Sequence, residues 1–405
     1  MPETPDQATL ANGGANAVTR EELIDRARAL LPAIAGRAAE ADRMRRLPDA
    51  TQAELMEAGL YRIYLPERYG GYELDYMLQV DLAAELGTAC GSTAWVHSVV
   101  ASHSWMHGMF DAGAQDAVWG EDPDALISGS TPTADSRVTP VDGGYVLDGT
   151  WTLASGVDVC RWNHFNMMTP RLDRDGMEHR YGLAPVSAVE LVDDWHTTGL
   201  RGTGSRSMIC RDLFIAEDRT IRSEACRGEP TRGSAVNPGP LYRMPLFSLF
   251  GKGIVAPAVG IARGALSLVV ERLAAQRMQS GARLAEEPTA QLRVGEAAAE
   301  IDAAWTLLRR DCGEVHAWAE AGEVPSLEER HRWRRNDGYA GRLLVQAVDR
   351  LMALGGATGN AEDSPLQRHW RDMHTLASHI ALAWDAQGAN YGRILLGLPT
   401  RDSKL

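Results

Sequence analysis

The sequence predicts an α+β protein made of an N-terminal helical domain, a middle β-barrel domain and a C-terminal four-helix bundle. Apolar residues recur at helical spacing as far as residue 120 and again from residue 246, which indicates two helical regions. Between them, residues 121–235 form short runs broken by turn residues, as β-strands do. A chain of 405 residues also exceeds what one hydrophobic core usually serves. We therefore expect domains at 18–120, 121–235 and 236–400, behind a disordered N-terminus at 1–17.

The first region is justified by helix-start signals as well as by periodicity. Thr19 and Glu22 form a capping box ahead of a regularly spaced apolar stripe. A second helix is expected at 48–59, between a proline and a glycine, and two more at 75–87 and 92–110. The first 120 residues are therefore predicted to be helical.

The middle region begins with a hairpin, since residues 137–141 and 145–147 flank Asp142-Gly143-Gly144. Further strand-like runs follow, and a Gly-, Pro- and Arg-rich connector at 225–240 ends the region. The other expected strands lie near 161–169, 182–192 and 207–216. Four long helices with short connections then predict an antiparallel bundle, at 246–276, 285–320, 327–356 and 366–396.

Composition excludes two classes of partner. The net charge of −13 argues against nucleic acid and against an anionic membrane surface, because both require a basic footprint. The most apolar stretch, 250–270, contains Lys252 and Arg263 and is predicted to be a buried helix and not a membrane span.

Cysteine usage favours the cytoplasm. The five cysteines are odd in number and widely spaced without a Cys-x-x-Cys pair, so neither a disulfide framework nor a zinc site is expected. No basic-then-apolar signal pattern is present among the first residues. The chain ends in Ser-Lys-Leu at 403–405, which is a peroxisomal address in eukaryotes. Because Lys252 and Lys404 are the only lysines, as in a high-GC bacterial gene, we interpret that ending as coincidence.

Two cofactor motifs are incomplete. Gly202-Thr203-Gly204 lacks the third glycine and the strand–helix context of a dinucleotide-binding turn. His103 and His107 are four residues apart on one helix face, but no glutamate lies between them and no third ligand is evident. We therefore expect no resident Rossmann cofactor and no metal.

Four segments offer candidate site residues. These are Ser-Thr-Ala-Trp-Val-His-Ser-Val-Val-Ala-Ser-His with Trp95 and His103, Trp-Thr-Leu-Ala-Ser-Gly with Trp151 and Ser155, residues 195–205, and the stretch with His374 and His379. Taken alone, each has an ordinary alternative: a core histidine, a serine bonding its own turn, or a β-turn with a surface arginine. Asp372 lies seven residues before His379, which on one continuous helix would place both on one stripe.

In this order, the segments resemble the oxygenase components of two-component flavin-dependent monooxygenases, which are built on the acyl-CoA dehydrogenase fold. The resemblance covers roughly residues 20–400, and residues 195–205 are similar to the family pattern Trp-x-x-x-Gly-x-Arg-Gly-Thr-Gly-Ser. It implies reduced FMN or FAD supplied by a separate flavin reductase, and reaction with O2 through a flavin hydroperoxide. It also implies hydroxylation of a small organic substrate, aromatic or phenolic, by a homotetramer.

The resemblance also implies roles for particular residues. His103 is expected to take a proton from the substrate, Ser155 to bond the flavin ring, and His379 to face the reactive edge of the flavin. Trp95 and His374 are expected near the substrate. The remaining cofactor contacts are expected from Trp151, Trp195, Arg201, Gly202, Thr203 and Ser205, with the planar Arg201 guanidinium suited to a phosphate or carbonyl.

Three alternatives stay open on the sequence. The same scaffold serves N-hydroxylases of amines or amino sugars. An acyl-CoA dehydrogenase would need a carboxylate base, but residues 379–390 offer only Asp385, outside a Tyr-Glu-Gly-Thr context. The third alternative is a catalytically silent flavin-binding or scaffold subunit.

Overall fold

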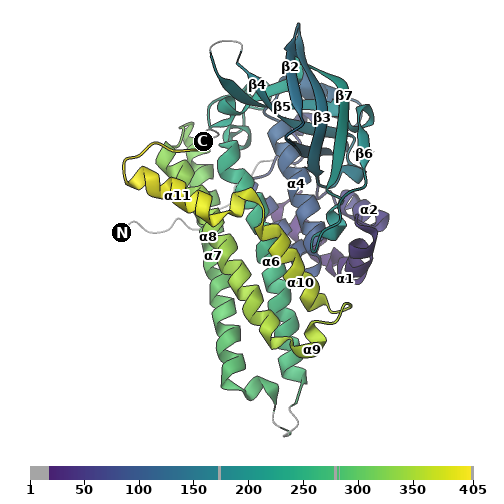
Figure 1. The fold of residues 1–405 in the computed structure, drawn as a ribbon, viewed down its shortest axis with the longest axis vertical. Helices are drawn as coiled ribbons and strands as arrows, with labels where there is room; N and C mark the ends of the chain where they lie inside the picture. The colour runs from purple at the N-terminus through teal and green to yellow at the C-terminus, as the bar shows by residue number, and fades with distance from the viewer. Residues whose placement is uncertain (1–17, 172–174, 278–280, 282, 403–405) are drawn as a thin grey trace.

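The computed structural model describes residues 18–171, 175–277, 281 and 283–402, so the segment at 1–17 and the terminal Ser-Lys-Leu lie outside the described residues. Strands gather at one end of the molecule, the N-terminal helices lie beneath them, and the long C-terminal helices run side by side away from the sheet (Figure 1). The predicted order of helices, strands and helices is confirmed.

Five helices form the N-terminal part. The capping box is present in both directions, with the Thr19 side chain accepting from the Glu22 backbone and the Glu22 side chain accepting from Thr19. Helix α4 is buried over almost its whole length, so it passes through the middle of the protein. The helices are α1 (Arg20–Met44), α2 (Asp49–Glu57), α3 (Tyr76–Ala89), α4 (Gly91–His107) and α5 (Ala112–Trp119).

In the part of the chain that the structure describes, eight strands form one sheet in the order β6-β7-β3-β1-β4-β5-β8, with β2 paired to β3. The predicted hairpin is β2–β3, in which Val141 pairs with Gly144. Strands β1 and β4 are parallel, and their pairing sets Gly129 beside His164. The strands are β1 (Ile127–Pro132), β2 (Arg137–Val141), β3 (Gly144–Ala154), β4 (Trp162–Pro170), β5 (Met177–Pro185), β6 (Glu190–Val192), β7 (Arg206–Ala216) and β8 (Thr220–Arg222).

The sheet encloses a hydrophobic core of its own. Tyr145, Trp151 and Phe165 are fully buried in it, and the Trp151 ring meets Phe165 edge-on at 5.8 Å. Among the described residues β6 and β8 pair on one side only, so the predicted barrel is a curved sheet without hydrogen-bond closure.

The C-terminal part differs from the sequence prediction at one point. The helix predicted at 366–396 is interrupted, because α10 ends at Ala377 and α11 begins at Trp384. His379 lies in the interruption with extended backbone (φ −65°, ψ 138°), and its side chain accepts from the Ala381 backbone N–H, which competes with a continuing helix. The helices are α6 (Leu246–Ala275), α7 (Pro288–Ala321), α8 (Leu327–Leu354), α9 (Gly356–Gly359), α10 (Pro365–Ala377) and α11 (Trp384–Leu395).

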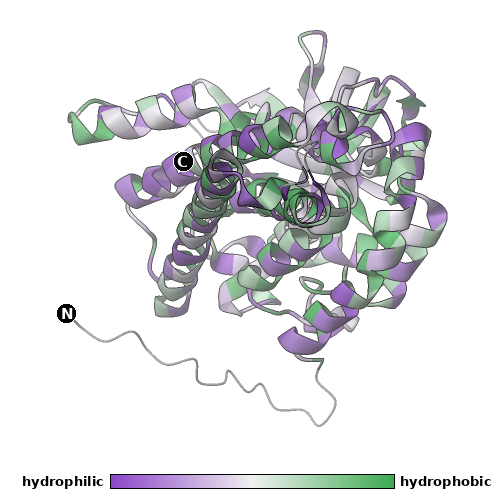
Figure 2. Cartoon of the chain, turned by 90° about the horizontal axis from the view of Figure 1, so that it is seen from below, coloured by the Kyte–Doolittle hydropathy of each residue, from purple (hydrophilic) through white to green (hydrophobic). Residues whose placement is uncertain are grey.

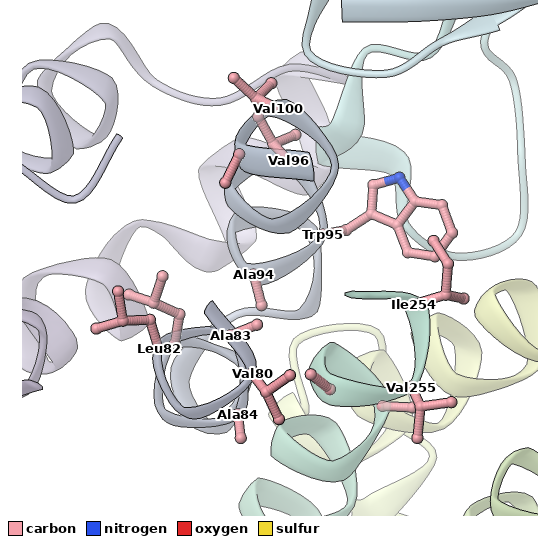
Figure 3. Close-up of a cluster of buried hydrophobic side chains, with 14 of the residues drawn as sticks. Val80, Leu82, Ala83, Ala84, Ala94, Trp95, Val96, Val100, Ile254 and Val255 are labelled. Carbon is pink, nitrogen blue, oxygen red and sulfur yellow. The ribbon is translucent and has the colours of Figure 1, made fainter. Parts of the chain in front are cut away.

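Small residues bring the N-terminal helices against the bundle. A Cβ on Gly87 of α3 would lie 2.9 Å from the Cα of Gly260 on α6, so only glycines allow this approach. Figure 3 shows a cluster of buried apolar side chains from α3, α4 and α6, with Trp95 and Ile254 at one edge of the view. Helix α4 is thereby fixed between the sheet and the bundle.

Helix α6 is long and apolar enough to cross a membrane by composition, but 72% of its most apolar window is buried inside the protein. Its Lys252 is fully buried and bonds Asp311 of α7 at 2.8 Å and Asp337 of α8 at 2.5 Å. Helix α6 is therefore a core helix, as its composition predicted, tied to its neighbours by a buried ion network.

Candidate active site

Trp95 connects three parts of the fold. Its indole N–H, on α4, donates a 3.0 Å hydrogen bond to the Ser155 hydroxyl just after β3. The same indole meets the His379 imidazole edge-on, with ring centroids 5.7 Å apart. Trp95 and Ser155 are each 8% exposed. The structure therefore brings together three residues that lie far apart in the sequence and that the sequence singled out.

The end of β3 is shaped to present Ser155. A bulge interrupts the pairing between Trp151 and Ala154, and Leu153 adopts a left-handed conformation (φ 64°) although it is not glycine. Gly156 follows at φ 70°, and a Cβ there would lie 2.8 Å from Val96 on α4. The strained strand end therefore re-aims the serine toward α4.

A chain of hydroxyl groups orients Ser155. Thr203 Oγ1 donates to the Leu200 carbonyl at 2.9 Å, so at its 2.7 Å contact with Ser205 it can only accept. Ser205 thus donates its single hydrogen to Thr203, and Ser155 must donate to Ser205 at 2.7 Å. Because Ser155 also receives the Trp95 N–H, its remaining capacity is that of an acceptor.

The turn at 195–205 is clamped onto the helices. Asp372 of α10 accepts the Leu200 backbone N–H at 2.6 Å, and a Cβ on Gly199 would lie 2.1 Å from the Arg371 carbonyl oxygen. Burial raises the pKa of Asp372 to about 7. Trp195 donates its indole N–H to the Leu200 carbonyl at 3.0 Å, which braces the turn from the other side.

Two residues of this turn differ in what they offer a ligand. Gly202 was expected to contact the cofactor, and a Cβ on it would lie 3.0 Å from both Ala41 of α1 and Ser92 of α4. The absence of a side chain at this position therefore allows tight packing between two helices. Arg201 is half-buried, and its Nε is buried without a hydrogen-bond partner. An unpaired buried guanidinium nitrogen needs an acceptor, which a flavin phosphate or carbonyl provides.

His379 is a hydrogen-bond donor at Nε2. Its Nδ1 accepts the Ala381 N–H at 3.2 Å, and burial lowers its pKa to about 4, so the ring is neutral near pH 7. A neutral ring with a lone pair on Nδ1 carries its hydrogen on Nε2. The predicted stripe with Asp372 does not form, because the helix ends between the two residues and Asp372 faces the turn at 199–200.

His103 lies two turns after Trp95 on α4, in different surroundings. Its Nδ1 is 3.2 Å from Nδ1 of His164 on β4, and its ring meets Phe250 of α6 edge-on at 5.5 Å. Among the described residues its Nε2 has no hydrogen-bond partner, and the side chain is 8% exposed. Burial lowers the pKa of His103 to about 4, so the imidazole is an unprotonated base at neutral pH.

Three other candidates lie elsewhere. The His374 Nε2 bonds Asp349 of α8 at 2.9 Å and its ring packs on Trp370 at 4.4 Å, which makes it part of the bundle surface. Trp151 fills the core of the sheet and donates to the Asn166 carbonyl at 2.9 Å, so its side chain is committed to that core. Asp385, the possible dehydrogenase base, is exposed in the first turn of α11.

His164 was not singled out from the sequence, and His107 was given no role in the site. Both are fully buried, and His107 Nδ1 lies 3.2 Å from His164 Nε2. The spacing of His103 and His107 on one helix face was the available signal, but nothing in the sequence indicates that β4 brings a third imidazole to it. Within the described ranges no group of three or more His, Cys, Asp and Glu side chains is arranged to hold a metal ion.

The fold and site together define a flavoprotein of the acyl-CoA dehydrogenase type. The N-terminal domain of acyl-CoA dehydrogenases matches residues 19–116 and their C-terminal domain matches residues 252–384. The hydrogen-bonding groups of the site fit a flavin. They are an unpaired Arg201 nitrogen, an accepting Ser155 oxygen and a donating His379 nitrogen, on segments that contact one another or contact the same third residue.

Known relatives narrow the class. The oxygenase subunit HsaA of a flavin-dependent monooxygenase from Mycobacterium tuberculosis is 36% identical over 379 residues, covering 92% of this chain and 95% of the relative. The oxygenase component of an FADH2-dependent resorcinol hydroxylase from Rhizobium is 34% identical, covering 89% and 90%.

Solved structures of similar proteins point to the same class of enzyme. The 3-HSA hydroxylase of Rhodococcus sp. RHA1 superposes with a TM-score of 0.89 at 34% identity, covering 95% of this chain and 99% of that one. XiaF from Streptomyces, in complex with FADH2 and glycerol, does so with a TM-score of 0.87 at 30% identity, covering 95% and 98%. The chain belongs to the oxygenase components of two-component flavin-dependent monooxygenases, which use reduced flavin as their cofactor.

Proposed function

We propose that this monooxygenase hydroxylates a phenol and that His103 removes the phenolic proton. The observation that supports it best is the state of His103, whose Nδ1 is held by His164 while Nε2 is unpaired on a neutral ring. Loss of the proton pushes electron density into the aromatic ring and makes its carbon a better nucleophile toward oxygen. One relative named above is a resorcinol hydroxylase, and resorcinol is a phenol.

The flavin end of the site is proposed to rest on Ser155, Arg201 and His379. Reduced flavin, when bound, supplies the activation of dioxygen. A reduced flavin carries an N–H on its central ring where an oxidised flavin carries a lone pair, so the accepting oxygen of Ser155 favours the reduced form. Arg201 offers its unpaired Nε to a phosphate or carbonyl. The His379 Nε2 hydrogen is a donor for oxygen bound beside the ring.

We also propose a homotetramer in the cytoplasm, supplied by a transiently bound flavin reductase. Apolar side chains at the free end of α11 support the assembly, because Leu395 and Leu396 are 62% and 77% exposed. Figure 2 shows hydrophobic colour at the outer end of this projecting helix. Five free, buried cysteines support a reducing compartment. Light scattering that reports a monomer at micromolar concentration would contradict the tetramer.

The phenol proposal is tested with matched substrate pairs. The purified oxygenase is combined with a general flavin reductase, NADH and either FMN or FAD, and offered phenols, their O-methyl ethers and the corresponding anilines. We expect hydroxylated product from phenols and none from the ethers, which have no proton for His103 to remove. Equal turnover of a phenol and its ether would overturn the role of His103, and product from anilines alone would favour N-hydroxylation.

A further inference from the structure

His103, His164 and His107 form a continuous chain of imidazoles. Nδ1 of His103 is 3.2 Å from Nδ1 of His164, and Nε2 of His164 is 3.2 Å from Nδ1 of His107. Nε2 of His107 is 3.1 Å from the Ala114 carbonyl oxygen, where the chain ends. Two members come from α4 and the third from β4, so the chain crosses the boundary between the helical domain and the sheet.

The Ala114 carbonyl determines which ring nitrogen carries the hydrogen in each of the three histidines. A carbonyl oxygen can only accept, so His107 carries its hydrogen on Nε2. Burial lowers the pKa of His107 to about 3 and that of His164 well below its usual range, so both rings are neutral. The neutral His107 therefore has a lone pair on Nδ1 and accepts from His164 Nε2–H. His164 in turn has a lone pair on Nδ1 and accepts from His103 Nδ1–H, which leaves the lone pair of His103 on Nε2.

The surroundings of the chain are aromatic. The His164 ring stacks on Phe110 at 5.0 Å, Trp119 meets His107 edge-on at 4.9 Å, and Phe250 of α6 meets His103. A Cβ on Gly129 of β1 would lie 2.1 Å from Nε2 of His103, so glycine is required for the ring to lie against the strand. The three rings bond one another in sequence through both nitrogens of His164, whereas metal ligands would point at one common centre.

We propose that His164 and His107 are positioning residues that hold His103 in the tautomer with its lone pair on Nε2. This inference rests on the proposed role of His103 as the substrate base. It adds two residues that orient that base, neither of which contacts the substrate.

When His103 acts as the base, the substrate O–H bond breaks and an N–H bond forms at His103 Nε2, which leaves a phenolate and an imidazolium. The imidazolium keeps its Nδ1–H bonded to the lone pair on Nδ1 of His164. Nε2–H of His164 remains bonded to His107 Nδ1 throughout. A charge that would be costly on an isolated buried imidazole is thereby stabilised by a hydrogen-bonded chain.

The tautomers are measured directly, without turnover. Solid-state nitrogen NMR of protein labelled with ¹⁵N-histidine distinguishes a protonated from an unprotonated ring nitrogen at each site. We expect His103 protonated on Nδ1 and His107 and His164 on Nε2. His97 of α4 is an internal reference, because its Nε2 lies 2.9 Å from the Leu60 carbonyl and must carry the hydrogen. A hydrogen on Nε2 of His103 would overturn the proposal, whatever the protein hydroxylates.

Two variants separate positioning from simple packing. His164→Phe keeps a ring of similar size beside Phe110 but removes the acceptor, so both tautomers of His103 become populated and kcat/KM for phenols falls about tenfold. His164→Asn restores an acceptor near the former Nδ1, and with it the Nδ1–H signal of His103 and most of the activity. The matched control is His97→Phe. It removes a buried histidine of α4 that does not belong to the imidazole chain, and it should leave the His103 signal unchanged.

The outcomes distinguish this proposal from the proposed function. If no phenol is hydroxylated but the three tautomers are as expected, the substrate class is wrong and the imidazole chain stands. If phenols are hydroxylated and His164→Phe matches the wild type in kcat/KM and in the His103 signal, the positioning role is wrong.

Discussion

His103 and His379 present opposite chemistry at the same ring atom. The Ala381 N–H occupies Nδ1 of His379 and leaves a hydrogen on Nε2, whereas the imidazole chain leaves a lone pair on Nε2 of His103. Both rings are neutral, with burial lowering each pKa to about 4. One imidazole is thus a donor beside Trp95 and the other a base beside Phe250.

Removing the two imidazoles should therefore damage different steps. His379→Ala loses the donor near the flavin, so hydrogen peroxide should be released faster than in the wild type even without substrate. His103→Ala loses the base, and phenol hydroxylation should slow about a hundredfold or more. Without substrate, the His103→Ala variant should release hydrogen peroxide as the wild type does. The rate of hydrogen peroxide release without substrate separates the two variants, and equal rates in both would refute the assignment.

Trp95→Phe removes the 3.0 Å hydrogen bond to Ser155 but keeps an aromatic ring beside His379. Ser155 then loses one of its two orienting partners, and we expect weaker binding of reduced flavin by roughly three- to tenfold. Anaerobic fluorescence titration measures this dissociation constant. Trp105→Phe is the control, because Trp105 is on the same helix and donates to the Leu241 carbonyl at 2.8 Å. An equal loss in both variants would indicate a general packing effect.

Ser205→Ala tests the direction of the Ser155 hydroxyl. Without Ser205 the Ser155 hydrogen has no fixed acceptor and can turn to the lone pair of an oxidised flavin. The preference for reduced over oxidised flavin should shrink by about threefold to tenfold, the value of one hydrogen bond. Paired dissociation constants for the two redox forms give the ratio. The control is Ser207→Ala, at another buried serine, on β7, which should leave that ratio unchanged. An unchanged ratio in Ser205→Ala would mean that the assigned direction of the Ser155 hydroxyl is wrong.

The sequence predicted the order of helices, strands and helices because the signals for these elements are local. A capping box at Thr19 and Glu22, the hairpin at 137–147 and long periodic stretches each depend on neighbours within a few positions. Ser155, Arg201 and His379 came instead from ordered short motifs that resemble a family, which periodicity alone would not have supplied.

What the sequence could not predict depends on contacts across the fold. His374 and His379 are five residues apart and were both expected in the site, but Asp349 of α8 pairs with the first and Trp95 of α4 meets the second. Because the helix breaks after Ala377, Asp372 does not share a helix face with His379. Its carboxyl group instead accepts the backbone N–H of Leu200, which lies in another domain. His164 joins the imidazole chain only because β4, a parallel neighbour of β1, brings it to α4.

Asp372 makes folding stability depend on pH. Burial raises its pKa to about 7 in the folded protein from 3.8, so between these values the folded state holds a proton that the unfolded chain has released. Stability from this group is therefore lost as pH rises, by about 1.4 kcal/mol per pH unit up to pH 7, and stays constant above.

Asp372→Asn retains an acceptor for the Leu200 N–H and cannot titrate. Its stability advantage over the wild type should therefore grow from pH 5 to pH 7 and then level off, as measured by denaturant unfolding of both proteins. The buried histidines titrate equally in both proteins and cancel in the difference. A difference that is constant from pH 5 to pH 8 would mean that Asp372 is ionised in the folded state throughout.

We propose that this chain transfers one atom of dioxygen to a phenol at the expense of reduced flavin. The most direct test supplies the oxygenase with a general flavin reductase, NADH, a phenol panel and ¹⁸O2, and determines the product masses. We predict a hydroxylated phenol with one ¹⁸O atom, lost when the reductase is omitted and strongly reduced in His103→Ala. Hydrogen peroxide as the sole product across the panel, or dehydrogenation of an acyl-CoA without oxygen, would contradict the claim.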